Sequence, residues 1–321
     1  MGYGLKRLTA AVHSAWLSLV ALILTPIKIF ADRHLLAYLD TAYQTQYRQE
    51  FVAVFEQHQS LLRETVTTEA VIKGNQAVFL VAGSGGATAV TRGVNGLIPA
   101  RSDDLTQNTA VLSEWHDLVR KTSFNIFASQ GNQRAIMQQS TVGVINRKID
   151  SQILTELNTG TITVGAASAT PTVSLFQNAR VKLSNASVPW DSNITFLSGA
   201  SYLAFLEEAP EFSNAQYVDM KPYSGGDQNP SWRDKPMAYR WRNTLLIEHP
   251  AIPGKATTSE KAFLYHKSAM GHAANTAGLT SAVGYNEEQD YSYARASMDM
   301  GVKLLQNTGI VVFTYDGTIY G

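Results

Sequence analysis

The stretch "ASQGNQRAIMQQSTVGVINRKIDSQILTELN", residues 128–158, carries the clearest structural pattern in the chain. Its residues recur at the 3.6-residue period of an α-helix, and the apolar ones dominate one face. The members of this face are Ala135, Gln138, Val142, Ile145, Ile149, Ile153, Glu156 and Leu157. Asn158 and Gly160 then provide a stop signal. We therefore predict a helix about 45 Å long at ~1.5 Å per residue, which would act as a backbone for other elements.

The segment before this helix, residues 66–120, is predicted to be a long two-stranded β excursion. "TTEAVIKGNQAVFLVAGSGGATAV" and "NTAVLSEWHDLVRKTSF" are rich in β-branched and aromatic residues. The turn-rich "TRGVNGLIPARSDDLTQ" between them places the loop tip near residues 93–104. A solitary hairpin is marginal in water because nothing covers its apolar face. We therefore expect it to lie on another part of the chain or on another chain.

An amphipathic stripe precedes the excursion. Apolar residues recur there at spacings of three and four, which indicates a helical face that must cover something. These residues are Leu39, Ala42, Tyr43, Tyr47, Phe51, Val54 and Phe55.

The remainder is predicted to mix short strands with short helices. The stretch "PTVSLFQNARVKLSNASVPW" (171–190) is predicted to be rich in strands, and "SGASYLAFLEEAPEF" (198–212) to be a helix that starts at Ser198 or Ser201 and closes before Pro210. Residues 221–236 are expected to be loop, and "MAYRWRNTLLIEHP" (237–250) a strand. The last stretch, 290–317, is expected to give two or three strands with turns at Gly301 and Asn307–Gly309. These patterns predict an α+β protein with antiparallel or mixed sheets.

Composition limits the classes of function. The 321 residues, 45% hydrophobic and 16% charged, are typical of a folded protein with two domains or one large domain. The net charge is zero, but residues 1–34 carry four basic residues against Asp32, a sum of +3, so the rest carries −3. A mildly acidic body argues against sequence-specific nucleic-acid binding. The absence of cysteine weakly favours a reducing compartment.

The search for a chemical site finds no convincing motif. His266 and His272 in "HKSAMGH" have a spacing that suits neither a helix face nor a strand-borne metal pair, and cysteine ligands are absent. "AGSGGA" (82–87) lacks the dinucleotide and phosphate-loop fingerprints, so we interpret it as a glycine-softened strand or bend. The acidic "NEEQD" (286–290) is best explained as a solvated turn. We therefore expect no metal, no cofactor and no enzymatic activity, and predict a structural or binding protein.

The order of elements resembles that of a known family. A helical arm, a long β excursion, a long helix, a mixed α/β region and closing strands resemble the major capsid (coat) protein of tailed bacteriophages, with the Hong Kong 97 fold shared with encapsulins. Three stretches resemble the loop tip with its return strand, a strand with a following helix, and the closing strands: "NGLIPARSDDLTQNTAVLSEW", "AFLYHKSAMGHAAN" and "GYNEEQDYSYARASMDMGVKLLQNTGIVVFTYDG". The resemblance covers about residues 35–321. It implies an N-terminal arm at residues 35–65, an extended β-loop at 66–127, and a spine helix with peripheral and axial domains at 128–321. Residues 1–34 are a separate hydrophobic N-terminal extension.

The resemblance also implies a function. Subunits would form hexamers and pentamers that tile an icosahedral head around double-stranded DNA, assembled in the host cytoplasm. Scaffold, portal and decoration proteins would be partners, contact with DNA would be nonspecific, and no membrane would be involved. The candidate inter-subunit contacts are Arg92, Arg101, Asp103, Asp104, Tyr43, Tyr47 and Phe51. For the four loop charges, an ordinary solvated loop is an equal alternative.

The N-terminus supports a rival hypothesis. Lys6 and Arg7 precede an apolar run of about ten residues, and Ala31 stands where a signal peptidase could cut. Against this, Ile29 occupies the −3 position, where small residues are usual. Because an export signal would defeat cytoplasmic assembly, we interpret residues 1–31 as a gene-start overextension or a scaffold-like extension. The alternatives are an encapsulin-like nanocompartment shell and an exported β-rich binding protein.

Overall fold

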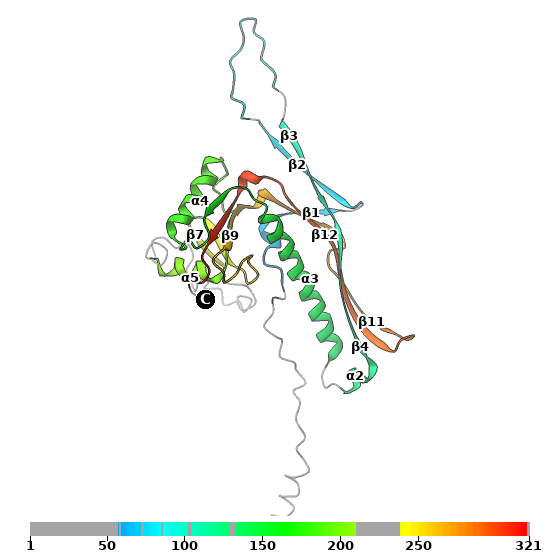
Figure 1. Ribbon diagram of the computed structural model, residues 1–321. Coiled ribbons are helices and arrows are strands. Elements are labelled where there is room, and N and C mark those ends of the chain that lie inside the picture. The colour runs from blue at the N-terminus through cyan, green and yellow to red at the C-terminus, as the bar shows by residue number, and fades with distance from the viewer. Residues whose placement is uncertain are drawn as a thin grey trace, which may run out of the picture. The chain divides into compact units, whose positions relative to one another are not determined.

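The computed structural model describes residues 57, 59–71, 74–84, 86–101, 104–128, 132–209 and 238–319 (Figure 1). The chain divides into two compact units, 1–50 and 51–321, and all of the described residues belong to the second. The N-terminal extension, the stripe at 39–55 and the loop at 221–236 lie outside the described residues. No helix in the described ranges has both the length and the apolar character needed to cross a membrane.

The long helix predicted from the sequence is confirmed as α3, Gln133–Leu157. It starts later than the quoted stretch because the Asn132 side chain caps it, accepting a hydrogen bond from the Ala135 N–H at 3.2 Å. Ile145, Ile149, Ile153 and Leu157 are buried, as their spacing predicts. Gln138 is exposed, so the buried face of α3 is narrower near the N-terminus of the helix.

One face of α3 packs on a five-stranded sheet. The strands are β1 (Thr67–Val71), β4 (Ser113–Thr122), β10 (Met270–Asn275), β11 (Thr280–Asn286) and β12 (Tyr291–Leu304). The central strand is β12, which pairs antiparallel with β4, β10 and β11, while β1 joins β10 in parallel. Ala296, Met298 and Met300 of β12 share a core with Ile145 and Ile149 of α3.

The predicted two-stranded excursion at 66–120 is wrong in its pairing. This part of the chain forms four strands, and only β2 (Gln76–Gly83) and β3 (Asp104–Val111) pair with each other. The flanking strands β1 and β4 join the five-stranded sheet instead, with partners 169 to 204 residues away along the chain. Local composition predicts strands correctly but carries no information on which distant strand will pair with them.

The predicted turn at Gly301 is also wrong, because β12 runs through it. A side chain at this position would overlap the Val111 carbonyl as β3 passes alongside. Glycine therefore serves close backbone approach here and not a reversal of the chain. The predicted turn at Asn307–Gly309 is confirmed as a 3₁₀ turn, η4, before β13 (Ile310–Tyr315). Similarly, the stretch "AFLYHKSAMGHAAN" leads from a strand through the turn η3 (Lys267–Ala269) into β10, not into a helix.

A second, six-stranded sheet is separate from the five-stranded sheet. Its strand order is β5 (Thr163–Gly165), β13, β9 (Glu260–His266), β6 (Ile194–Ser198), β8 (Thr244–Glu248) and β7 (Ala238–Trp241). Helices α4 (Val173–Asn185) and α5 (Ala200–Glu208) share one core with this sheet. The C-terminal part of α3 contributes to the core that contains Leu197, Ile247 and Phe263. The mixed sheets and helices agree with the predicted α+β class.

The strand-rich prediction for 171–190 is wrong, since α4 occupies most of it. The Thr172 side chain caps the helix by accepting from the Leu175 N–H at 3.1 Å. Phe176, Ala179 and Leu183 then fall on one buried face at helical spacing. The predicted helix at 198–212 is confirmed as α5, which ends before Pro210.

A buried histidine in the five-stranded sheet predicts a pH dependence of stability. His272 of β10 is 0% exposed, and neither ring nitrogen has a hydrogen-bond partner among the described residues. Burial, and then the nearby charge of Arg63, lower its pKa from 6.5 to about 4. The folded state therefore holds a neutral ring, whereas the unfolded chain takes up a proton below pH 6.5.

As pH falls from about 6.5 to about 4, the free energy of unfolding should decrease by about 3 kcal/mol on account of this residue. Above pH 6.5 the contribution is constant. Urea unfolding of the unassembled subunit at pH 7 and pH 5, compared with His272→Leu, measures it. Equal pH dependence in the two proteins would contradict the assignment.

Candidate functional site

The β2–β3 hairpin presents one covered face and one exposed face. In the covered face, Ala77, Phe79 and Ala110 pack on Ala273, and the Phe79 ring lies against Gly271, where a side chain would crowd it. The alternation of a strand places its neighbours on the opposite face. That exposed face carries Val78, Leu80, Leu105 and Val111, which are 50–61% exposed. We call these four residues the hairpin stripe.

The loop between the two strands continues this apolar surface. Val90, Val94, Leu97 and Ile98 are all more than half exposed. The loop has local structure, because the Gly93 N–H donates to the Leu97 carbonyl at 3.1 Å. An isolated subunit therefore presents an apolar surface on the uncovered face of the hairpin and on its loop, which is typical of an interaction site.

The predicted contact residues of the loop lie around this surface. Arg92 is exposed, Asp104 is exposed at the first position of β3, and the Arg101 side chain donates to the Ser84 carbonyl at 3.1 Å. Asp103 falls outside the described residues, as do the arm residues Tyr43, Tyr47 and Phe51. Their roles as contacts therefore stay predictions. The bend predicted at "AGSGGA" is confirmed, since β2 ends at Gly83 and Gly86 has a φ of 73°.

The first described residues of the chain, from Gln57 to Leu62, contact a buried carboxylate, Asp150, which the sequence analysis did not identify. The Asp150 side chain of α3 is 1% exposed and accepts hydrogen bonds from residues 57–62 and from His249, which follows β8. Burial alone would raise the pKa of this carboxyl group, but the bonds from His249, Ser60, Leu61 and Leu62 outweigh burial and lower it. The available signal was an acidic residue directly after Ile149 and one helical turn before Ile153 and Leu154, both of which are buried.

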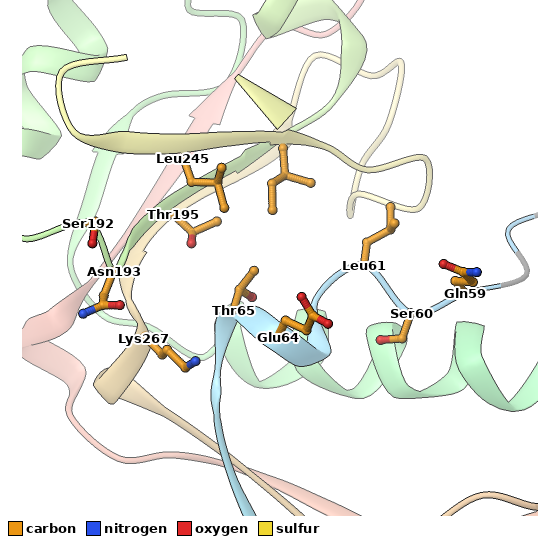
Figure 2. A pocket seen from close by; sticks show the side chains of 11 residues that line it. Gln59, Ser60, Leu61, Glu64, Thr65, Ser192, Asn193, Thr195, Leu245 and Lys267 are labelled. Atoms are coloured by element: carbon orange, nitrogen blue, oxygen red, sulfur yellow. The ribbon is translucent and has the colours of Figure 1, made fainter. Parts of the chain in front are cut away.

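A pocket lies beside residues 59–65 (Figure 2). Glu64 and Thr65, at the 3₁₀ turn η1 (Arg63–Thr65), face Thr195 of β6 and Leu245 of β8 across it. Lys267 and Asn193 lie at its side. The lining mixes one acidic, one basic and several neutral groups, so it shows no chemical preference for a particular ligand.

The remaining sequence motifs do not form a reactive centre. His266 of β9 contacts Asp191 at 3.1 Å and Ser268 at 2.7 Å, whereas His272 lies apart in the other sheet. Asp290 accepts from Ser123 at 2.6 Å and also bonds Tyr285, in an exposed turn as predicted for "NEEQD". Within the described ranges, no group of three His, Cys, Asp or Glu side chains could hold a metal ion.

The chain is similar in fold to solved structures of phages and of a GTA particle. The chain is similar to a structure of Mycobacterium phage Che8, with a TM-score of 0.61 and 16% identity over 83% of this chain and 95% of that one. The capsid of Ralstonia phage GP4 gives 0.63 and 10%, over 86% and 96%. The capsid of a native GTA particle gives 0.62 and 12%, over 87% and 98%. These likenesses show the Hong Kong 97 fold.

The family comparison extends from fold to function. No curated relative matches the sequence. The family model described as "Phage capsid protein" matches residues 39–317, which is most of the chain and includes both sheets, the hairpin and α3. The chain therefore belongs to the phage capsid protein family, and it is a major capsid protein that self-assembles into the phage head and resides in the virion.

Proposed function

We propose that the subunits assemble through hexamers and pentamers into an icosahedral head that encloses double-stranded DNA. The observation that carries this proposal is the hairpin stripe, together with the apolar loop that continues it. A hairpin that exposes apolar side chains is stabilised when it lies over a neighbouring subunit. When every subunit does this to the next one, the contact is heterologous and closes into a ring by rotation.

The parts of the chain then have distinct roles in the shell. Residues 66–127 contain the extended loop, whose β2–β3 hairpin and connecting loop reach the neighbour, while β1 and β4 stay in the sheet of their own subunit. Residues 35–65 are the N-terminal arm that adds a second contact. Residues 128–321 form the spine helix with the peripheral and axial domains. Arg92, Arg101, Asp103 and Asp104 on the loop, and Tyr43, Tyr47 and Phe51 on the arm, are the proposed contact residues. The role is structural, and the proposal assigns no catalytic residue.

The charge distribution bears on the contents of the head. Residues 35–321 carry a net charge of −3, so electrostatic attraction to DNA phosphates is weak and nonspecific. A wall of this kind encloses a genome without binding it tightly. Scaffold, portal and decoration proteins are the further partners that we propose. Residues 1–31 are expected to be absent from subunits of the mature particle.

Microscopy of the full chain expressed in a bacterial cytoplasm tests this proposal. We expect closed shells, or hexamers and pentamers of several hundred kilodaltons, in negative-stain images and on size-exclusion chromatography. A subunit that stays monomeric at all protein and salt concentrations would contradict the proposal. N-terminal sequencing of subunits from particles would show whether residues 1–31 persist.

A further inference from the structure

We propose that Asp150 is the positioning residue of the N-terminal arm. It fixes Gln57 and residues 60–62 in one register on α3 and so attaches the C-terminal end of the arm to the body of the subunit. The inference rests on the proposed function in one respect, since it assigns to that arm a contact between subunits. The anchoring itself is a property of the single subunit and can be measured independently.

Five donors converge on the single carboxylate of Asp150. Oδ1 accepts from the Ser60 hydroxyl at 2.5 Å and from the Leu62 N–H at 3.2 Å. Oδ2 accepts from the Gln57 side-chain amide, from the Leu61 N–H at 3.0 Å and from His249 Nε2 at 3.2 Å. Four of these five donors, from Gln57, Ser60, Leu61 and Leu62, belong to the C-terminal segment of the arm. The interaction is therefore built around that segment.

The donor pattern requires a group that only accepts. The Ala251 N–H donates to Nδ1 of His249 at 3.1 Å, so Nε2 carries the ring proton that points at Asp150. A neutral histidine satisfies both contacts. Because every neighbour of both oxygens is a donor, an ionised carboxylate fits the site and a carboxamide of the same shape does not. An asparagine here would turn its NH₂ group toward one set of donors.

The hydrogen bonds of Asp150 hold three parts of the fold in fixed positions relative to one another. Asp150 belongs to α3, His249 follows strand β8, and residues 57–62 lead into β1. One helical turn before Asp150, Arg147 donates to the Gln57 carbonyl at 3.2 Å. Leu62 is 0% exposed in the core formed with Ile149 and Ile153. A shift of the segment by one residue would break these bonds together and move Leu62 out of the core.

A matched pair elsewhere in the subunit supplies the control. His266 repeats the geometry of His249: its Nδ1 accepts from the N–H of Ser268 two residues on, at 3.2 Å, and its Nε2 lies 3.1 Å from an aspartate, Asp191. The bonds of Asp191 run to Asn193 and His266, and none runs to residues 57–62. This pair is more exposed, at 10% for His266 and 44% for Asp191 against 1% for both His249 and Asp150. Loss of Asp191 therefore removes a histidine–aspartate contact of similar geometry and leaves the donors of Asp150 in place.

The test compares the full-length wild type, Asp150→Asn and Asp191→Asn. Cleavage by trypsin after Arg63 in the unassembled subunit reports on the anchor. We expect Asp150→Asn to be cleaved at least 10-fold faster, with far-UV circular dichroism unchanged, and Asp191→Asn to match the wild type. Particle yield should fall at least 10-fold for Asp150→Asn alone, with shells of irregular size.

A second variant covers the case in which Asp150→Asn does not fold. Gln57→Glu places a second carboxylate against Asp150 from the partly exposed segment and changes nothing in α3 or the sheets, so the same increase in cleavage is expected. Unchanged cleavage after Arg63 in the folded variants would overturn the proposal, even if assembly changed. Increased cleavage with normal particles would confirm the anchor and refute its role in assembly. If the wild type itself formed no particles, the proposed function would fail while cleavage would still decide the anchor.

Discussion

The double substitution Leu80→Asp with Leu105→Asp is expected to abolish closed shells while leaving the subunit folded. Both residues belong to the exposed face of the β2–β3 hairpin, at 61% and 54% exposure. Their loss removes little buried surface from the subunit, so its free energy of unfolding should change by only about 0.5 kcal/mol. In the assembled shell, however, both carboxylates would lie in an interface without a partner.

The expected loss of association is large. Burying an unpaired charged group costs several kcal/mol, and about 3 kcal/mol per interface weakens association about 100-fold. Closed particles should therefore disappear at concentrations at which the wild type assembles fully. Negative-stain images and sedimentation measure this, and urea unfolding checks the subunit.

Val181→Asp provides the control for the added charge. Val181 lies on α4, is 55% exposed and is remote in sequence from the hairpin. Its change should leave particle yield close to that of the wild type. Normal shells from the double variant would mean that the hairpin stripe is not an interface.

The second large effect is expected from Phe196→Ala in β6. Phe196 is 0% exposed and makes edge-on ring contacts with Phe176, Tyr202 and Phe313, with centroids 5.2–5.3 Å apart. These contacts join the six-stranded sheet to helices α4 and α5. Truncation leaves a cavity, and buried Phe→Ala changes cost about 3–5 kcal/mol. That is a large share of the about 5–15 kcal/mol by which most domains are stable.

Urea unfolding of the unassembled subunit measures this loss. Phe127→Ala is the matched control, because Phe127 is 87% exposed and its removal should change stability by less than about 0.5 kcal/mol. If Phe196→Ala proves insoluble, Phe196→Leu should retain the fold with a smaller loss. A destabilisation below about 1 kcal/mol for Phe196→Ala would show that the aromatic cluster contributes little to the core of the six-stranded sheet.

Elements with a strong local period were predictable from the sequence. The α3 helix follows from the spacing of Ile145, Ile149 and Ile153, and the strands β2, β3 and β13 follow from their composition. The helix α4 was missed because its β-branched and polar residues outweighed the spacing of Phe176, Ala179 and Leu183 in the interpretation. In that segment, burial against the sheet decides the conformation more strongly than residue propensity does.

The sequence predicted that the β excursion exposes an apolar surface, but it did not predict which strands carry that surface. The hairpin stripe of β2 and β3 stays exposed, as expected for an excursion that cannot bury its own apolar residues. The strands β1 and β4 differ from this expectation, because they pair with β10 and β12 in the same subunit. The arm residues Tyr43, Tyr47 and Phe51 lie outside the described residues, so their contacts stay predictions.

The sequence by itself determined the long helix, the presence of most strands, the lack of a recognisable catalytic motif and, by resemblance, the capsid family. Only the tertiary structure decided which strands pair, why Gly301 must lack a side chain, and that Asp150 anchors residues 57–62. The physical reason is the range of the interactions. Helical period and capping act over a few residues and can be read along the chain. The bonds of Asp150 join residues about 90 positions apart, and only folding brings those groups together.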